Sequence, residues 1–334
     1  MKSGLLFLVL LLLVACPIAG ASVNPPASPV RLIFIHHSCG SNWLSDSNGG
    51  LGLALRDNNY FVSDTNYGWG PDSIGSSTDI GHWWLWFRGP NSAAYLSALY
   101  AENGTHSSYS RMSTCPEGEN RIVMFKSCYP NSALNGSPDD PVPAIESNPL
   151  KGQSCGSQYH TVANAKGIYL DLLEYFKTCP DKLFVVIAAP PLRDATYSDN
   201  ARIFNNWLVN GWLTNYTSGN VFVFDFYNVL TTNGGDANTN DLNLETGNHH
   251  RWWNDMVQHI TNGDDDGDPN VLEYPTGDDH PSKAGNTKAT AEFVPLLNDA
   301  YETYTVPELS PTAIMLALSA ASLIALSVAK RKRN

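Results

Sequence analysis

The fold class of this chain is decided by the stretch RLIFIHHSCG, residues 31–40. Its apolar run, Leu32–Ile35, does not alternate with polar residues and ends at two histidines, a serine, a cysteine and a glycine. Continuous hydrophobicity is typical of a strand buried on both faces, as in a parallel sheet. Ser38, just after this run, is therefore either a nucleophile on the edge of a sheet or the N-cap of the next helix.

Similar runs recur along the chain, separated by segments of helical length. The strand-like runs are Ile122–Phe125, Leu183–Ala188, Val221–Phe226 and the weaker Tyr60–Val62. Helices are expected over Val162–Lys177, over Ala201–Leu213 and after residue 282, where Pro295 would bend or interrupt the last one. This alternation predicts a single α/β domain with a doubly wound parallel sheet, flavodoxin-like and three-layered (α/β/α).

Composition and charge narrow the class of protein. Of the 334 residues, 43% are hydrophobic and 11% aromatic, which is typical of a globular protein with a core. The formal net charge is −12. Such a chain offers no basic stripe that could neutralise phosphates, so we expect no nucleic-acid partner.

The N-terminus has the pattern of a secretory signal. Met1 and Lys2 precede an apolar run over Leu5–Ala15. A small-residue motif favours cleavage after Ala21, although a lipoprotein-type box ending at Cys16 competes with it. We divide the chain into a signal peptide (1–21), one domain (22–305) and a C-terminal segment (306–334).

The C-terminal segment predicts attachment to a membrane. Residues 312–329 form a mostly apolar stretch long enough to span a bilayer as a helix, and basic residues follow at 330–333. The domain would then lie outside the membrane, exported to the cell surface. Together with Pro307-Glu308-Leu309, this layout resembles the sorting signals of PEP-CTERM and PEF-CTERM surface proteins. The resemblance implies a sorting or processing enzyme as a partner; a permanent helical anchor is the alternative.

Polar clusters follow the predicted strands. They are His36–Gly40, Asn66–Pro71, Lys126–Ser132 and, before the last helix, Gly277–Gly285. In open α/β sheets, ligands bind at the carboxyl ends of the strands. We therefore expect these clusters to meet in one site.

The order of these clusters resembles the SGNH (GDSL-type) hydrolases over about residues 30–304. The family's serine, glycine, asparagine and histidine would correspond to Ser38, to Gly68 or Gly70, to Asn131 and to His280. The resemblance implies that Ser38 is the nucleophile and His280 the base. It also implies an oxyanion hole built from the Ser38 N–H, a glycine N–H and the Asn131 amide.

The blocks depart from the family pattern in three places. His36 and His37 stand where the family commonly has Gly-Asp, and we expect them to hold the loop by hydrogen bonds. The third block lacks the usual Gly-x-Asn-Asp pattern. Gly277 stands three residues before His280, so Asp278 rather than Asp279 is our choice for the acid that orients the imidazole.

Serine, histidine and a carboxylate together perform acyl transfer to water, most simply ester hydrolysis, with no cofactor required. The expected location suggests an ester or an acylated carbohydrate as substrate, for example O-acyl groups on a polysaccharide. The alternative is a non-catalytic cell-surface or binding protein on an SGNH-like scaffold.

A metal site and disulfides are two further expectations. Asn262, Asp264, Asp266, Asp268 and Glu273 have the spacing of ligands in a calcium-binding loop, which would hold a structural ion; the alternative is a solvated acidic loop. In an exported protein, cysteines pair. We expect Cys39–Cys128 and, less directly, Cys155–Cys179, which leaves Cys115 over.

Overall fold

The structure, a computed structural model, describes residues 24–192, 195–231 and 278–305, and the backbone of residues 239–240, 249–253, 256–260 and 264–265. The predicted signal peptide and C-terminal segment lie outside the described residues. So does the predicted calcium loop, apart from the backbone of Asp264–Asp265. Within the described ranges, no helix has both the length and the apolar character needed to cross a membrane.

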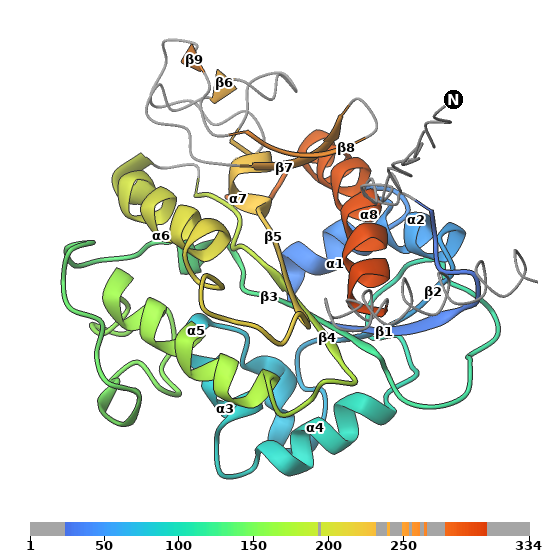
Figure 1. Ribbon diagram of the computed structural model, residues 1–334, viewed down its shortest axis with the longest axis horizontal. Helices are drawn as coiled ribbons and strands as arrows, with labels where there is room; N and C mark the ends of the chain where they lie inside the picture. Colours follow the sequence, from blue (N-terminus) through green and yellow to red (C-terminus); the bar gives the residue numbers. More distant parts are fainter. Residues whose placement is uncertain are drawn as a thin grey trace, which may run out of the picture.

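Helices and strands alternate along the chain (Figure 1). The strands are β1 (Val30–Ile35), β2 (Tyr60–Thr65), β3 (Ile122–Lys126), β4 (Leu183–Ile187), β5 (Val221–Phe224), β6 (Thr239–Asn240), β7 (His249–Trp253), β8 (Met256–Ile260) and β9 (Asp264–Asp265). The α-helices are α1 (Ser38–Leu44), α2 (Leu51–Asp57), α3 (Trp83–Phe87), α4 (Ser92–Ala101), α5 (Val162–Phe176), α6 (Ser198–Asn210), α7 (Phe226–Val229) and α8 (Lys283–Thr305). Short 3-10 helices are η1 (Pro71–Ser76), η2 (Ile80–His82), η3 (Tyr129–Ser132), η4 (Ile145–Ser147) and η5 (Ala195–Tyr197).

Five strands form a central sheet in the order β2-β1-β3-β4-β5, and every neighbouring pair is parallel. Strand β2 lies on one side of β1, and the next strand along the chain, β3, lies on the other side of β1. This reversal makes the carboxyl ends of β1 and β3 the switch point at which α/β proteins of this strand order bind ligands. The predicted doubly wound, flavodoxin-like sheet is confirmed.

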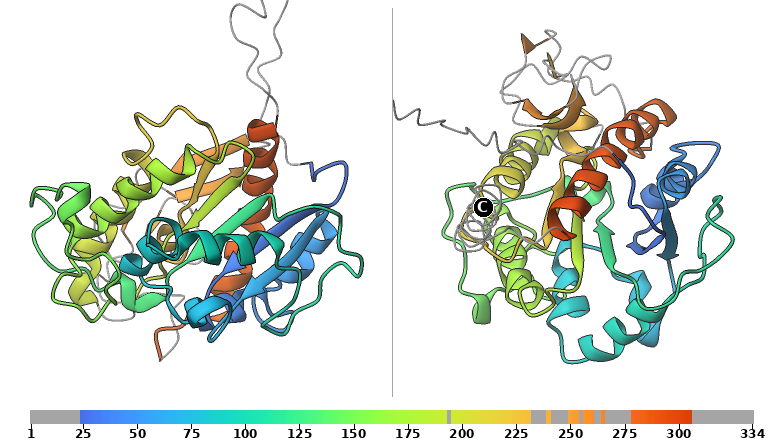
Figure 2. Two further views of the ribbon diagram at one scale, coloured as in Figure 1. Left: turned by 90° about the horizontal axis from the view of Figure 1, so that it is seen from below. Right: turned by 45° about the vertical axis from the view of Figure 1, so that its right-hand side comes forward.

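Successive residues of β1 point into two different cores, as the continuous apolar run requires. Ile33 and Ile35 pack with side chains from α3, α4, α5 and α6. Leu32 and Phe34 pack with side chains from α1, α2, α7 and α8. Figure 2 shows the helices on both faces of the sheet. The result is the predicted three-layer α/β/α domain.

Two boundaries differ from the expectation in an informative way. The run Val221–Phe226 is a strand only to Phe224, because Asp225 caps α7 by accepting the Asn228 N–H. Helix α8 continues through Pro295 and is not interrupted there. Residues of α8 on both sides of Pro295 pack in the core, and this packing offsets the local cost of the proline.

Helix α8 is fastened to α1 through the indole of Trp43. The Trp43 Nε1–H donates to Thr290 Oγ1 at 2.9 Å, and the ring packs on Phe293. The segment that carries His280 immediately precedes this helix, so the contact brings the end of the domain beside its beginning.

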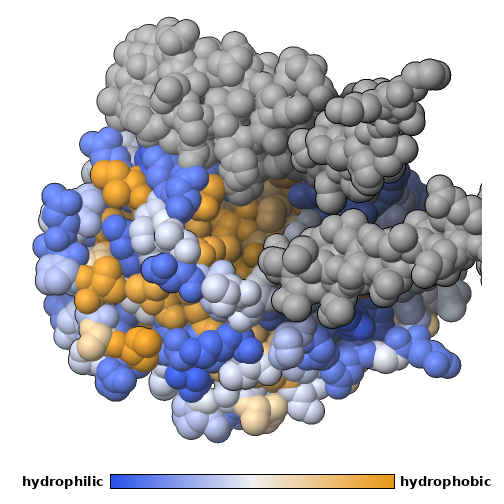
Figure 3. All heavy atoms as spheres, in the orientation of Figure 1, coloured by the Kyte–Doolittle hydropathy of each residue, from blue (hydrophilic) through white to orange (hydrophobic). Residues whose placement is uncertain are grey.

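Hydrophobic side chains gather around β5, at the end of the described sheet, on the face drawn in Figure 3. A groove of about 300 Å³ runs there between α6 and α8, lined in part by Val209, Leu213, Phe222 and Leu296. None of the predicted site residues lines this groove.

Candidate active site

Ser38 is the first residue of α1, and two residues separate it from the end of β1. The turn between them is tight, since a Cβ added at Gly40 would lie 2.4 Å from the Cβ of His36. Any larger residue at position 40 would push the helix away from the strand. Ser38 is partly buried, whereas Cys39 and Gly40 are buried.

His36 and His37 hold this turn by hydrogen bonds. The His36 ring is fully buried between the His37 carbonyl oxygen (2.8 Å) and Asp64 Oδ2 (3.1 Å). The His37 ring bridges the Gly75 carbonyl oxygen (2.6 Å) and Thr78 Oγ1 (3.0 Å). Burial lowers the pKa of His37, which favours the neutral imidazole.

His280 reaches Ser38 although 242 positions separate them: its Nε2 lies 2.9 Å from Ser38 Oγ. The ring is flanked by Tyr129, whose ring centroid lies 5.1 Å away in an edge-to-face arrangement. The side chain of His280 is 21% exposed. A hydroxyl and an imidazole at this distance form the pair needed to transfer a proton from serine.

Asp278 stands on the other side of the imidazole. Its Oδ2 lies 3.2 Å from His280 Nδ1, and its Oδ1 accepts the His280 backbone N–H at 3.4 Å. The Oδ2 and Nδ1 atoms are close, but they do not form an aligned hydrogen bond. The Asp278 side chain is 75% exposed. Asp279, the alternative, has a left-handed backbone with φ of 68°.

The three other expected oxyanion donors, Gly68, Gly70 and Asn131, differ in their present surroundings. The Gly68 N–H donates to Ser76 Oγ at 2.9 Å. Gly70 precedes η1 with φ of 76°, a conformation that favours glycine. Asn131 is buried; its Nδ2 donates to Asp79 Oδ1 (2.8 Å) and to the Cys128 carbonyl oxygen (3.3 Å).

Tyr67, which the sequence reasoning missed, lies directly over the nucleophile. Its hydroxyl lies close to Ser38 and interacts with both the side chain and the backbone of that residue. Its ring stacks on His37 with centroids 3.8 Å apart, yet 64% of the residue is exposed. A substrate oxygen that approaches the Ser38 N–H would therefore meet the Tyr67 hydroxyl. Its place directly before Gly68, within the second polar cluster, was the available signal.

Cys128 is the second neighbour of the nucleophile that was not assigned to the site. Its Sγ lies 3.9 Å from Ser38 Oγ. The neighbouring Cys39 thiol and the charge of buried Lys126 lower the pKa of the Cys128 thiol. All five described cysteines are free thiols, so neither expected disulfide is formed in this structure.

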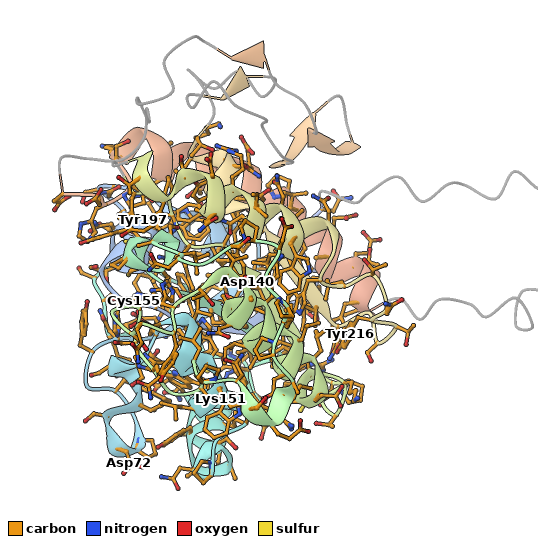
Figure 4. All side chains as sticks on the ribbon, turned by 90° about the vertical axis from the view of Figure 1, so that its left-hand side faces the viewer. Asp72, Asp140, Lys151, Cys155, Tyr197 and Tyr216 are labelled. Atoms are coloured by element: carbon orange, nitrogen blue, oxygen red, sulfur yellow. The ribbon has the colours of Figure 1, made fainter. Side chains whose placement is uncertain are left out.

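A large cavity lies away from Ser38 and His280. This cavity, of about 780 Å³, is lined by residues around α5 and α6, among them Leu170, Trp207, Trp212 and Tyr216. In the view of Figure 4, Tyr216 and Cys155 lie on opposite sides of the domain. The Cys155 N–H donates to Asp79 Oδ2. Since neither Ser38 nor His280 lines the cavity, its size does not make it the reaction centre.

Within the described residues, no group of three or more His, Cys, Asp or Glu side chains is arranged to hold a metal ion. Comparison of the chain with models of known families, with curated proteins and with solved structures found no match.

Proposed function

We propose that this protein is a serine ester hydrolase of the SGNH type, with Ser38 as nucleophile, His280 as general base and Asp278 as the acid that orients the imidazole. The observation that carries the proposal is the distance of 2.9 Å between Ser38 Oγ and His280 Nε2. It joins two polar clusters from opposite ends of the domain, at the switch point of the sheet.

The chemistry follows from the two ring nitrogens. Nε2 accepts the hydroxyl proton as Ser38 Oγ attacks the acyl carbon, and Nδ1 carries the other proton toward Asp278. His280 then donates the proton to the leaving alcohol. In the second half, His280 removes a proton from water, which attacks the acyl-serine and releases the acid.

The Ser38 N–H is the first donor for the oxyanion. To reach it, the acyl oxygen must displace the Tyr67 hydroxyl, which lies beside Ser38. Gly68, Gly70 and Asn131 remain our proposed further donors. Gly68 and Asn131 would have to exchange their present partners, Ser76 and Asp79, for the substrate. Each donor contributes about 3 kcal/mol to lowering the barrier when it is aligned.

Export and anchoring are part of the proposal. The signal-like N-terminus and the apolar, basic C-terminus support a location at the cell surface, held by residues 306–334 or passed to a sorting enzyme. We propose acylated carbohydrate as the substrate class, because ester groups on polysaccharide are accessible to an enzyme outside the membrane. A calcium ion held by Asn262, Asp264, Asp266, Asp268 and Glu273 would serve structure, not the reaction.

The test is hydrolysis of p-nitrophenyl acetate by the purified full-length protein, together with labelling by a fluorophosphonate. Ser38→Ala should abolish labelling and lower the rate by about a thousandfold or more. The matched control is Ser45→Ala, at the end of the same helix, whose hydroxyl contacts only the exposed Ser47 hydroxyl among the described bonds. Equal rates for Ser38→Ala and the unaltered protein would reject the esterase and favour a binding protein on this scaffold.

A further inference from the structure

Two cysteines lie directly beside the proposed nucleophile because of the register of the sheet. Ile35 of β1 pairs with Phe125 of β3. Ser38 and Cys128 each come three residues after these paired positions. The two residues therefore lie side by side at the carboxyl ends of the two strands. Cys39 follows Ser38 in α1.

The two thiols lie in one cluster and interact with each other. The Cys39 thiol lowers the pKa of the Cys128 thiol, whereas Cys128 and burial raise the pKa of the Cys39 thiol. The register of β1 and β3, the adjacency of Cys39 to Ser38 and the 3.9 Å contact of Cys128 Sγ with Ser38 Oγ place both sulfurs beside the same serine.

Access and charge assign different roles to the two residues. Cys39 is fully buried, whereas Cys128 is partly exposed. Lys126 is fully buried, and its charge favours the thiolate of Cys128. Cys128 is therefore the thiol that a soluble disulfide meets first, and Cys39 is placed to resolve the mixed disulfide.

We propose that Cys39 and Cys128 are a redox modification site, a reversible disulfide formed beneath Ser38, and that forming it raises the esterase activity. The effect on activity rests on the proposed function; the formation of the disulfide does not.

The activation has a physical cause in the distance of 3.9 Å between Cys128 Sγ and Ser38 Oγ. Attack by Ser38 develops negative charge on the acyl oxygen next to this sulfur, and a thiolate there opposes that charge. A disulfide is neutral and draws the sulfur toward Cys39.

The exchange balances with a small-molecule disulfide such as oxidised glutathione. The Cys128 thiolate attacks one glutathione sulfur and releases the other as a thiolate. The Cys39 thiol then loses its proton and attacks Cys128 Sγ, which releases the second glutathione. One protein S–S bond forms, one glutathione S–S bond breaks, and two electrons pass from the protein thiols to glutathione.

The test equilibrates the full-length protein in buffers of reduced and oxidised glutathione, traps free thiols with N-ethylmaleimide and identifies linked peptides by mass. The same samples are assayed with p-nitrophenyl acetate. We expect a Cys39–Cys128 peptide in the oxidised sample and a rate about tenfold higher than in the reduced one, corresponding to about 1.4 kcal/mol. Cys39→Ser should remove both the peptide and the response to the buffer. Cys115→Ser, which changes a cysteine that bonds to the Pro116 carbonyl oxygen, should retain both.

The outcomes separate this inference from the proposed function. Absence of the linked peptide in oxidised glutathione overturns the modification site. A linked peptide with equal rates in both buffers overturns the activation. A linked peptide in a protein without esterase activity, formed equally in Ser38→Ala, supports the site and rejects the proposed function.

Discussion

Tyr67 lies face to face with His37, at a centroid distance of 3.8 Å and an angle of 24° between the rings. This stacking holds the tyrosine beside Ser38, so that its hydroxyl interacts with that residue. The buried histidine of the first polar cluster thus positions a side chain of the second cluster above the nucleophile. The aromatic contact couples the two loops at the switch point of the sheet.

Removing the Tyr67 hydroxyl should free the oxyanion donor. Tyr67→Phe keeps the stacking on His37 but loses the hydroxyl that lies beside Ser38. Displacing a polar group that interacts with the protein costs about 0.5–1.5 kcal/mol, so kcat/KM for p-nitrophenyl acetate should rise by roughly two- to tenfold. A fall in kcat instead would mean that the hydroxyl itself assists the reaction.

Asp278 should contribute modestly to the rate, because its side chain is 75% exposed and water screens its charge. Asp278→Asn keeps the size of the side chain, and we expect kcat for p-nitrophenyl acetate to fall by about tenfold, less than for a buried acid. Asp279→Asn is the matched control, since asparagine tolerates the left-handed backbone there. A larger loss in Asp279→Asn than in Asp278→Asn would exchange their roles.

Asp225 should make stability depend on pH. Burial raises the pKa of this carboxyl to about 7, whereas an aspartate in an unfolded chain titrates at about 4. Between these values the unfolded chain has released the proton and the folded chain still holds it. The free energy of unfolding therefore falls as the pH rises through this window, by up to about 4 kcal/mol.

Asp225→Asn cannot ionise, and its amide oxygen can still cap α7. Urea unfolding at pH 4.5 and 7.0 should show a smaller decline for this variant than for the unaltered protein. The exposed Asp199→Asn serves as the control and should keep the decline. The same decline in Asp225→Asn would assign the pH dependence to other groups.

The pair of His36 and Asp64 should be a main support of the nucleophile turn. Both side chains are fully buried, and Asp64 Oδ1 also accepts the His106 N–H at 2.6 Å. Asp64→Ala leaves these groups without their acceptor, so we expect a loss of about 3–5 kcal/mol in the free energy of unfolding. Asp57→Asn changes an exposed carboxylate and should cost less than about 0.5 kcal/mol. A loss of under 1 kcal/mol in Asp64→Ala would contradict this role.

The fold could be predicted from the sequence because strands that are buried on both faces have continuous apolar runs. All four residues of Leu32–Ile35 are buried in one of two cores, and no polar residue could alternate with them. Even the weak run at Tyr60–Val62 was part of a longer strand, β2. Pro295 did not interrupt α8, because tertiary packing of that helix outweighs the local cost of a proline.

The site was less predictable, because the hydrogen-bond partners of its residues depend on contacts between segments that are distant in the sequence. The sequence could bring Ser38 and His280 to one edge of the sheet by topology alone. It could not show that the Asn131 amide bonds to Asp79, since Asp79 lies on a loop with no strand pattern. Nor could it place Cys128 beside Ser38, since that depends on the register between β1 and β3.

The separation of Ser38 and His280 along the chain has a consequence for biosynthesis. Ser38 is among the first residues of the domain to be made, and its base arrives only when α8 follows and packs on Trp43. A growing chain therefore carries a serine without a proton acceptor through most of its synthesis. Under the proposed function, the protein would acquire its reactivity only as the last helix docks, so hydrolysis would report completion of folding.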